Sequence, residues 1–534
     1  MAFKSQSPAS KPEDLSYKRA LKVVNDSAAV VSIADLSDDL LWNIFMKNNR
    51  RTSDVDWKNS PLATAWSCAH VCRRWREIII NSPSLWAAII DLNAMSRFKA
   101  EWQDEIRHRT GQALLAIRGY FIYYGNTGQN LLLPFLRCDW TRIESLSLAI
   151  LRARSVLCPE EDWLCLFRSA PRLRRCVIQL DEDIYDPALH NPNCKLFNDD
   201  APLLETLQYS HLSFIISPDA SWLCGIRNLD ISHVSSMSTN HLLQVLEKMP
   251  CLEYLRLMKV LSSHSRTWPQ LSIHLPKLDE IELVCHPCAW AVFLTQIMPK
   301  ATCKLHLLAA SESAPINEED MALLKQVLSR YSESYFNHQL TTSFSIKLND
   351  DFINISSWLS GSMSVQMPDF QVQIDSETMG QPLSLISLVD AFAGCNLHSV
   401  SSLEVIHHSD HGLGWDIHLS VLLSKFTNIE TIVAGLDNIT TLQHLQCINW
   451  VSFPHLKTIR IVPTDWLFFA QQPLTRGICQ NILAFVESLR IYRAPVEVLD
   501  LTGWNEIVGL ELFDHFEDLK VIHSTQNGTL PFVW

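Results

Sequence analysis

Two segments near the N-terminus decide the fold of the first part of this chain: IADLSDDLLWNIFMKNN at residues 33–49 and PLATAWSCAHVCRRWREIIINSPSLWAAII at residues 61–90. In the first segment, either Ser37 or Asp35 suits a helix start, and Asp38 and Asp39 favour the positive end of a helix dipole. The apolar residues then recur with the spacing of one helical face, at Leu36, Leu40, Leu41, Ile44 and Phe45.

The second segment predicts a similar amphipathic helix, which ends before Pro83. Its apolar residues recur every three or four positions, at Ala65, Ala69, Cys72, Trp75 and Ile79, and its polar residues Arg73, Arg74, Arg76 and Glu77 fill the other face. Together the segments predict two or three short helices in about 55 residues. A unit of that size buries too little apolar surface to be stable alone, so we expect it to pack against a partner or the rest of the chain.

The two segments resemble the two halves of an F-box. Residues 36–41 (LSDDLL) are similar to the family's opening Leu-Pro-x-Glu followed by two aliphatic residues, and Ile44 and Phe45 continue it. Residues 71–76 (VCRRWR) and 82–86 (SPSLW) are similar to the second half. The chain departs from the family at Ser37, which replaces the usual proline, and in the long spacer from Lys47 to Ser60.

The resemblance implies a non-catalytic substrate receptor of a Skp–cullin–F-box ubiquitin ligase. In such a receptor, the F-box docks a Skp-type adaptor, which links it to a cullin, and the rest of the chain holds a protein substrate. Carried onto this chain, the adaptor-binding residues are Leu36, Leu40, Leu41, Ile44, Phe45, Val71, Cys72, Trp75 and Ile78. The alternative is an amphipathic hairpin that only caps the fold, in which these side chains pack internally.

Beyond residue 91, the pattern Leu-x-x-Leu-x-Leu recurs to the end of the chain, as in residues 143–148, 173–178, 204–209, 226–231, 252–257, 278–283, 403–406, 429–432, 456–461, 496–501 and 519–522. The first six starts lie 22 to 31 residues apart (143, 173, 204, 226, 252, 278). Leucine-rich repeats have periods of roughly 20–29 residues. The pattern is therefore typical of irregular leucine-rich repeats, which often follow an F-box in that family.

Amphipathic helices are expected before several of these strands, at residues 160–169, 239–248, 416–425 and 506–516. No side-chain ladder is expected at the turns, because the equivalent positions hold Asp181, Val260, His286, Thr464 and Trp504. Between residues 300 and 400 a helix is expected from Asn317 to Tyr331 and strands at 343–348 and 369–374, but the sequence does not indicate whether the repeats continue there.

The predicted fold is therefore α/β. A flexible tail and lead-in helix (1–32) precede an F-box-like helical domain (33–91) and a curved, irregular leucine-rich-repeat-like solenoid (92–534), with parallel strands inside and helices outside.

Composition and charge narrow the class of partner. The chain has 534 residues and a net charge of −13, which argues against a nucleic-acid binder. No run of 18 apolar residues and no secretory signal are present, so we expect neither a membrane span nor secretion. The 15 cysteines form no disulfide framework. These features predict reduced thiols and a location in the cytoplasm or the nucleus.

Catalytic signatures are missing from the sequence, including nucleophile-elbow, phosphate-loop, dinucleotide, zincin and kinase motifs, and only 15 glycines are present. Cys285 and Cys288 form one CxxC without a second pair at zinc spacing. His407, His408, Asp410 and His411 cluster after an expected strand and are interpreted as a solvated loop. We therefore expect no metal and no cofactor.

A substrate would be read by strand side chains that alternate with the core leucines. On this basis the candidate substrate-binding residues are Tyr254, Arg256, Glu280, Glu282, Arg460 and Asp500, which share no common charge. For any single one of these residues, an ordinary solvated strand position is the favoured interpretation. Three hypotheses follow: an F-box substrate receptor, a leucine-rich interaction scaffold whose F-box-like hairpin binds no adaptor, and an enzyme without a recognised signature.

Overall fold

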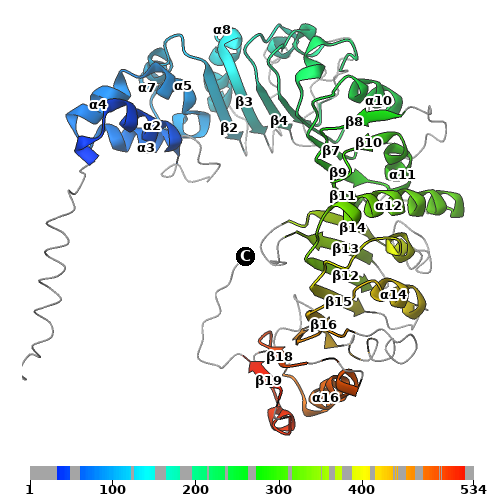
Figure 1. Ribbon diagram of the computed structural model, residues 1–534. Helices are drawn as coiled ribbons and strands as arrows, with labels where there is room; N and C mark the ends of the chain where they lie inside the picture. The colour runs from blue at the N-terminus through cyan, green and yellow to red at the C-terminus, as the bar shows by residue number, and fades with distance from the viewer. Residues whose placement is uncertain are drawn as a thin grey trace, which may run out of the picture. The chain divides into compact units, whose positions relative to one another are not determined.

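The computed structural model describes most of the chain, namely residues 33–48, 60–121, 126–150, 164–180, 195–212, 216–234, 238–261, 272–310, 316–349, 352–359, 367–375, 388–408, 415–436, 439, 442, 453–463, 473–491, 494, 496–504, 506–516 and 518–523. The predicted tail and lead-in helix at 1–32 lie outside these residues. The protein is mixed α/β, as predicted, and divides into two compact units, Met1–Arg118 and Gly119–Trp534 (Figure 1).

The first unit is mainly helical and extends past the predicted boundary at residue 91, because a second strand completes it. That strand pairs in parallel with the short strand at Ile90–Asp91, through Ile90 with Ile117 and Asp91 with Arg118. The elements are η1 (Ile33–Asp35), α2 (Asp38–Asn48), α3 (Pro61–Ala69), α4 (Arg73–Ile80), α5 (Pro83–Ala88), β1 (Ile90–Asp91), α6 (Leu92–Met95), α7 (Ala100–Arg109) and the start of β2 (Leu115–Phe121), whose residues from Gly119 onward belong to the second unit.

The second F-box-like segment forms two helices rather than the single one expected before Pro83. The chain leaves helical geometry at Cys72, whose backbone is extended (φ −156°, ψ 169°). Cys72 is the N-cap of α4, where its sulfur accepts a hydrogen bond from the backbone N–H of Trp75. Helical periodicity alone could not reveal this break, because the apolar spacing continues through it.

The second unit is organised by a large, mostly parallel sheet. Its strands are β3 (Ile143–Ile150), β4 (Arg175–Leu180), β5 (Thr206–Ser210), β6 (Asn228–Ser232), β7 (Tyr254–Met258), β9 (Glu280–Cys285), β11 (Lys304–Ala309), β12 (Ser343–Asn349), β13 (Phe352–Trp358), β14 (Phe370–Asp375), β15 (Ser402–His408), β16 (Thr431–Gly435), β17 (Thr458–Val462), β18 (Val498–Leu501) and β19 (Lys520–His523). The strands β8 (Ile273–Leu275) and β10 (Ile297–Pro299) form a separate parallel pair.

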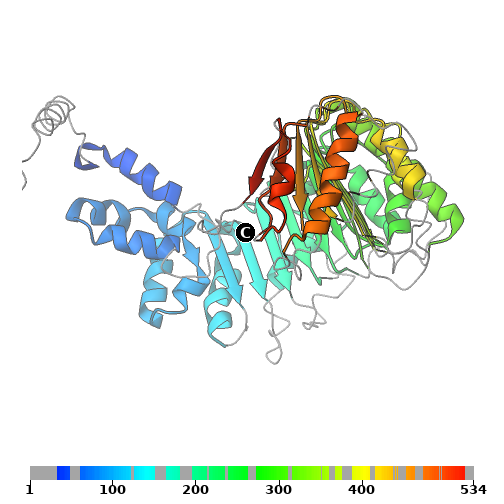
Figure 2. The ribbon, with the colours of Figure 1, turned by 90° about the horizontal axis from the view of Figure 1, so that it is seen from below.

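Helices and short 3-10 turns connect these strands. They are α8 (Asn126–Cys138), η3 (Trp140–Arg142), η4 (Leu164–Phe167), η5 (Leu196–Asp199), η6 (Ser221–Gly225), α10 (Thr239–Glu247), α11 (Pro287–Thr295), α12 (Glu318–His338), η8 (Asp390–Phe392), α14 (Trp415–Leu423), α16 (Arg476–Ile491) and η9 (Leu510–Phe513). Within this unit, α10, α11, α12, α14 and α16 lie on one side of the sheet (Figures 1 and 2). The opposite face carries the strand side chains that point away from those helices.

Every predicted Leu-x-x-Leu-x-Leu motif overlaps a strand, and the middle residues of the motifs align across the sheet. The aligned column runs through Leu146, Cys176, Leu207, Leu229, Leu255, Ile281 and Leu305, all of them buried. Each strand therefore places the second apolar residue of its motif beside the equivalent apolar residues of the neighbouring strands. This continuous apolar column is the reason why units that are too small to fold alone stack in register.

The region from 300 to 400 continues the sheet but interrupts its order. The expected helix and both expected strands are present as α12, β12 and β14, whereas β11 and β13 were not predicted. Strand β14 pairs in parallel with β11, and β12 pairs in parallel with β15, while β13 lies between β12 and β14 and is antiparallel to both. The expectation of parallel strands throughout is therefore wrong at β13.

In two of the four segments expected to be helices, the described residues form only a short 3-10 turn. Helices α10 and α14 match the predictions at 239–248 and 416–425. By contrast, only η4 lies in the described part of 160–169, and only η9 lies in 506–516. Gly509 precedes η9 with a left-handed backbone (φ 109°), which starts the turn late and leaves room for only one turn of helix.

Three consecutive strands are each followed by a residue with a left-handed backbone. His211, His233 and Lys259 follow β5, β6 and β7 with φ of 57°, 57° and 52°. Their backbone N–H groups donate to the carbonyls of Ser232, Met258 and Val284 on the next strand, at 3.0, 2.7 and 2.7 Å. The next residue in each case, Leu212, Val234 and Val260, is buried. At these turns, main-chain hydrogen bonds to the next strand satisfy the backbone.

Replacing Lys259 by glycine is expected to stabilise the protein, by up to about 1 kcal/mol, because glycine adopts a left-handed backbone without a steric penalty. Lys259→Val is expected to destabilise it by about 1–2 kcal/mol, because a β-branched side chain clashes in that conformation. The urea midpoint measures both changes. The matched control is Lys248→Gly at the C-cap of α10, where φ is −89° and glycine offers no relief. Equal effects at both lysines would contradict the assignment of strain to Lys259.

Candidate functional site

The first candidate surface lies on the F-box-like helices of the first unit. Helix α2 starts after Ser37, whose hydroxyl accepts a hydrogen bond from the Leu40 N–H at 3.3 Å, so of the two expected cap residues Ser37 fills the role. Asp38 and Asp39 occupy the first turn. The helix therefore begins where the sequence predicted, and this start fixes which side chains of α2 face inward.

The apolar face of α2 divides into two stripes, one buried and one exposed. Leu41 and Phe45 belong to the core of the unit, with 0% and 5% of their surface exposed. Leu40 and Ile44 are 52% and 40% exposed, and Leu36, one turn earlier on the same stripe, is half-buried. The packing of the unit thus accounts for Leu41 and Phe45 but leaves Leu40 and Ile44 in solvent.

The turn between α3 and α4 adds further exposed apolar surface. Val71 is 62% exposed, and Cys72 is exposed as well. Trp75 is half-buried, because its ring packs edge-on against Phe45 with the centroids 5.2 Å apart. Ile78 is also half-buried, whereas its neighbour Ile79 is the fully buried residue of α4.

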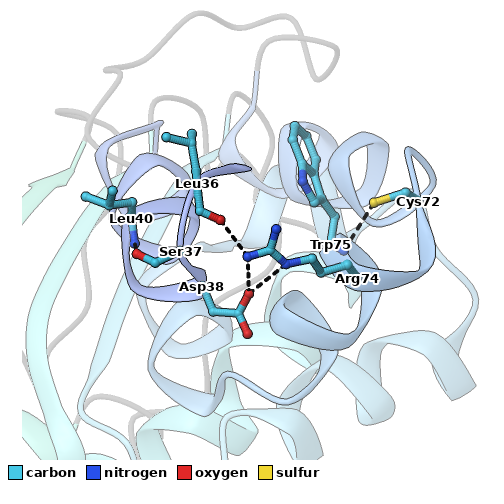
Figure 3. A network of polar contacts seen from close by, with 7 residues as sticks. All are labelled: Leu36, Ser37, Asp38, Leu40, Cys72, Arg74 and Trp75. Atoms are coloured by element: carbon cyan, nitrogen blue, oxygen red, sulfur yellow. Dashed lines mark hydrogen bonds and ion pairs between the residues drawn. The ribbon is translucent and has the colours of Figure 1, made fainter. Parts of the chain in front are cut away.

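Arg74 connects the start of α2 to α4 (Figure 3). Its Nε donates to Asp38 Oδ1 at 2.8 Å, its Nη2 lies 2.6 Å from the same oxygen, and Nη2 also donates to the Leu36 carbonyl at 2.5 Å. The sequence pattern predicted Arg74 only as a residue on the polar face of a helix. Its contacts with Asp38 and Leu36 were not predicted. Helical periodicity reports which face a residue occupies but not which distant group it meets.

Arg74→Ala is expected to lower the stability of the first unit by about 1 kcal/mol. The substitution removes the contacts of the guanidinium with Asp38 Oδ1 and with the Leu36 carbonyl oxygen, which solvent screens only in part. Arg74→Lys should recover only part of this loss, because an ammonium cannot reach both acceptors with fork geometry. Chemical denaturation of the full chain, followed by the near-ultraviolet signal of the unit's tryptophans, measures the change. Arg73→Ala is the control, because Arg73 is fully exposed and pairs only within its own helix, with Glu77.

The second candidate surface is the sheet face opposite the helices, where β7 and β9 lie side by side. The predicted alternation is present: Leu255 and Leu257 are buried, and Tyr254 and Arg256 are half-buried on the other face. The Tyr254 hydroxyl donates to Glu282 at 3.0 Å, and Arg256 Nε lies 3.1 Å from Glu282. Burial, with the nearby Glu282 carboxylate, raises the pKa of Tyr254, which keeps the phenol protonated.

Glu280 lies in register with Tyr254 and faces β11, where His306 Nε2 is 3.8 Å from its carboxylate. Burial lowers the pKa of His306 despite the neighbouring carboxylates, so the imidazole is neutral at pH 7. This part of the sheet therefore holds a polar cluster of Tyr254, Arg256 and Glu282, and Glu280 lies beside it on β9, next to His306.

Arg460 and Asp500 lie elsewhere in the second unit, on β17 and β18, with Arg460 Nε 3.6 Å from Asp500 Oδ2. Followed from one paired strand to the next, β11, β14, β13, β12, β15 and β16 separate them from β9. The structure thus brings four of the six predicted residues together, and it places the other two in a separate pair.

Asp230 on β6 belongs to the cluster and was missed. It is in register with Arg256, and its Oδ2 lies 3.7 Å from Arg256 Nη1. The alternation that pointed to Arg256 between Leu255 and Leu257 also holds for Asp230 between Leu229 and Ile231. Burial raises the pKa of Asp230, and Arg256 opposes this effect.

No group of three or more potential ligands for a metal ion occurs among the described residues. Cys285 is buried at the end of β9, and Cys288 lies in the first turn of α11, where its N–H donates to His286 Nδ1 at 3.3 Å. His286 is therefore an N-cap residue. His407 and His408 are the last two residues of β15 and do not belong to the loop that was predicted for them, whereas Asp410 and His411 lie outside the described residues. Each helix that the structure describes is too short or too polar to span a bilayer.

Sequence comparisons were made against protein-family models and against curated proteins. No family model matches this chain, and no curated protein matches it significantly.

Proposed function

We propose that this protein is a substrate receptor that joins a protein substrate to a Skp-type adaptor and, through the adaptor, to a cullin ubiquitin ligase. In this proposal the first unit is the adaptor-binding F-box, the second unit is an irregular leucine-rich-repeat solenoid, and the sheet face opposite the helices of that unit holds the substrate. The receptor catalyses nothing; it raises the effective concentration of the substrate beside the ubiquitin-carrying enzyme.

The observation that carries the proposal is the exposed apolar surface of the F-box-like helices. Leu40, Ile44 and Val71 are each at least 40% exposed, although Leu41, Phe45 and Ile79 of the same helices are buried. Scattered single apolar residues are normal on a surface, but exposed apolar residues that repeat along one stripe of a helix are typical of helix-in-groove recognition. A specific complex of this type buries roughly 800 Å² on each partner.

Two further observations support the proposal. The surface occurs in the segment whose residues 36–41, 71–76 and 82–86 resemble an F-box, and the four helices α2, α3, α4 and α5 pack together there. In addition, the strands of the second unit follow the leucine-rich pattern and pair in chain order from β3 to β7. Stacked repeats of this kind present an extended sheet face to a partner.

The test is co-expression of the full chain with a Skp-type adaptor, followed by size-exclusion chromatography with mass determination. A one-to-one complex is the expected result. If folded, monodisperse protein elutes without the adaptor, the receptor function is refuted, and the interaction-scaffold alternative, in which the helices only cap the repeats, replaces it. A cullin added to the one-to-one complex should then bind only when the adaptor is present.

A further inference from the structure

A pocket of about 260 Å³ lies on the sheet face opposite the helices of the second unit, where strands β4 to β7 begin. Its polar lining comes from four neighbouring strands: Arg175, Thr206, Gln208, Asn228, Asp230 and Tyr254. Pockets for whole small-molecule ligands are usually about 300–1,000 Å³. This one is the size of a single long side chain, and its rim is open to a partner that lies across the strands.

Asp230 is the charged group at the buried side of this pocket, with only 8% of its surface exposed. One carboxylate oxygen, Oδ1, accepts a hydrogen bond from the Ser232 hydroxyl at 3.2 Å. The other, Oδ2, lies 3.7 Å from Arg256 Nη1, which is longer than a hydrogen bond. An ionised carboxylate can accept several donors, so Asp230 retains unused acceptor capacity at the pocket.

Arg256 does not neutralise Asp230 fully, because Glu282 competes for it. The Nε of Arg256 is 3.1 Å from Glu282, closer than its Nη1 is to Asp230. Glu280 adds a third carboxylate on the same face, and its neighbour His306 is neutral at pH 7. Asp230 and Glu282 thus share one guanidinium, and the two carboxylates together carry more negative charge than Arg256 can offset.

We propose that this pocket binds one cationic side chain, a lysine or an arginine, of the protein held on the sheet face. This substrate class rests on the receptor function proposed above. The cation meets the Asp230 carboxylate, which Arg256 offsets only in part because it is shared with Glu282, while the amide groups of Gln208 and Asn228 supply further acceptors at the pocket wall. Charge-assisted hydrogen bonds of this type are roughly twice as strong as neutral ones.

Arg175 supplies an internal check on the sign of the charge. It lines the same pocket but is exposed, so its guanidinium is in solvent, unlike the Asp230 carboxylate. A ligand cation is repelled by Arg175 and attracted by Asp230. Replacing the two residues must therefore change cation binding in opposite directions.

The experiment uses the full chain and four small probes: the N-acetyl methylamides of arginine, lysine, citrulline and norleucine. Citrulline has nearly the shape of arginine and norleucine that of lysine without its amine, and both are uncharged. Saturation-transfer NMR and competition between probes measure binding, because single amino-acid derivatives bind weakly. We expect saturable binding of the arginine and lysine probes, and at least about ten-fold weaker binding of their neutral counterparts.

Three variants complete the test. Asp230→Asn keeps the shape of the side chain and should weaken binding of the cationic probes at least about ten-fold. Arg175→Gln should strengthen it. Asp279→Asn is the matched control, because its carboxylate is exposed, pairs with Lys300 at 2.7 Å and is not in the pocket, so binding should be unchanged. Thermal melts of all three variants establish that each is folded.

Equal binding of citrulline and arginine, or unchanged binding in folded Asp230→Asn, would overturn the cationic pocket. Equal losses in Asp279→Asn and Asp230→Asn would also overturn it, since only the overall negative charge would then matter. Adaptor binding is measured separately, because it uses the other unit. Asp230→Asn should still form the adaptor complex when it no longer binds the cationic probes. Conversely, a chain that does not bind the adaptor can still bind the probes, so the two proposals fail independently.

Discussion

The double substitution Leu40→Asp with Ile44→Asp is expected to abolish binding of a Skp-type adaptor and to leave the protein folded. Both side chains are substantially exposed, at 52% and 40%, so the aspartates remain hydrated in the free protein. In the complex, the same carboxylates would be buried in an apolar groove without partners, which carries a large desolvation cost. We expect the dissociation constant to rise at least roughly 100-fold.

The controls separate lost contact from lost structure. Leu114→Asp changes an exposed leucine of the same unit (42%) outside the F-box-like segment, and it should bind the adaptor normally. Leu41→Asp places a charge in the core next to the same stripe and should unfold the unit. Size-exclusion chromatography and circular dichroism report the two outcomes. Persistence of the complex in the double variant would mean that the adaptor binds elsewhere; unfolding of that variant would favour an internal, capping role.

The strands of the second unit could be predicted because their pattern reports burial directly. Leu255 and Leu257 are buried and flank Arg256, and the same alternation recurs in β9. A one-residue shift in register would turn these leucines toward solvent, so the sequence specifies the register strongly. The helices were less predictable. A segment that connects two strands needs only to cover the buried apolar residues of those strands, and a 3-10 turn such as η4 or η9 does so.

The left-handed turns and strand β13 could not be predicted, for different reasons. His211, His233 and Lys259 are not residues that signal a left-handed backbone; the neighbouring strand holds their N–H groups and imposes the conformation. Strand β13 has a mixed pattern, because Ser356 and Ser357 are both buried between antiparallel neighbours. Both features depend on contacts between segments distant in sequence.

Most residues of the two candidate surfaces were named from the sequence, but their burial and their grouping in space were not predicted. The apolar residues of α2 were identified as one face, yet packing against α4 divides them, because Leu41 and Phe45 lie about 100° around the helix from Leu40 and Ile44. The charged residues of β7 and β9 were identified, but Asp230 was omitted although it obeys the same alternation. Predicting the pocket at Asp230 requires knowing which strands are neighbours, and strand pairing is a property of the fold.

The second large effect is expected from Phe344→Ala, in the strand that joins the antiparallel insertion to the rest of the sheet. Phe344 is fully buried, and its ring centroid lies 5.7 Å from that of Phe336 on α12 and 5.3 Å from that of Phe426 after α14. Truncating a buried phenylalanine removes its packing and leaves a cavity that the surrounding elements cannot close completely. We expect a loss of about 3–5 kcal/mol in the free energy of unfolding.

The position of Phe344 makes its effect more than a local one. Strand β12 is the parallel neighbour of β15, and β15 carries the pairing onward to β16. In stacked architectures each unit is stabilised by its neighbours, so a weak junction lets the two sides unfold separately. Urea denaturation with hydrogen exchange should therefore show two transitions, with amides of β15 and β16 exchanging in the first. Met367→Ala, at an 82% exposed position before β14, should change stability by less than about 0.5 kcal/mol. A single unshifted transition for Phe344→Ala would show that the insertion does not depend on this aromatic contact.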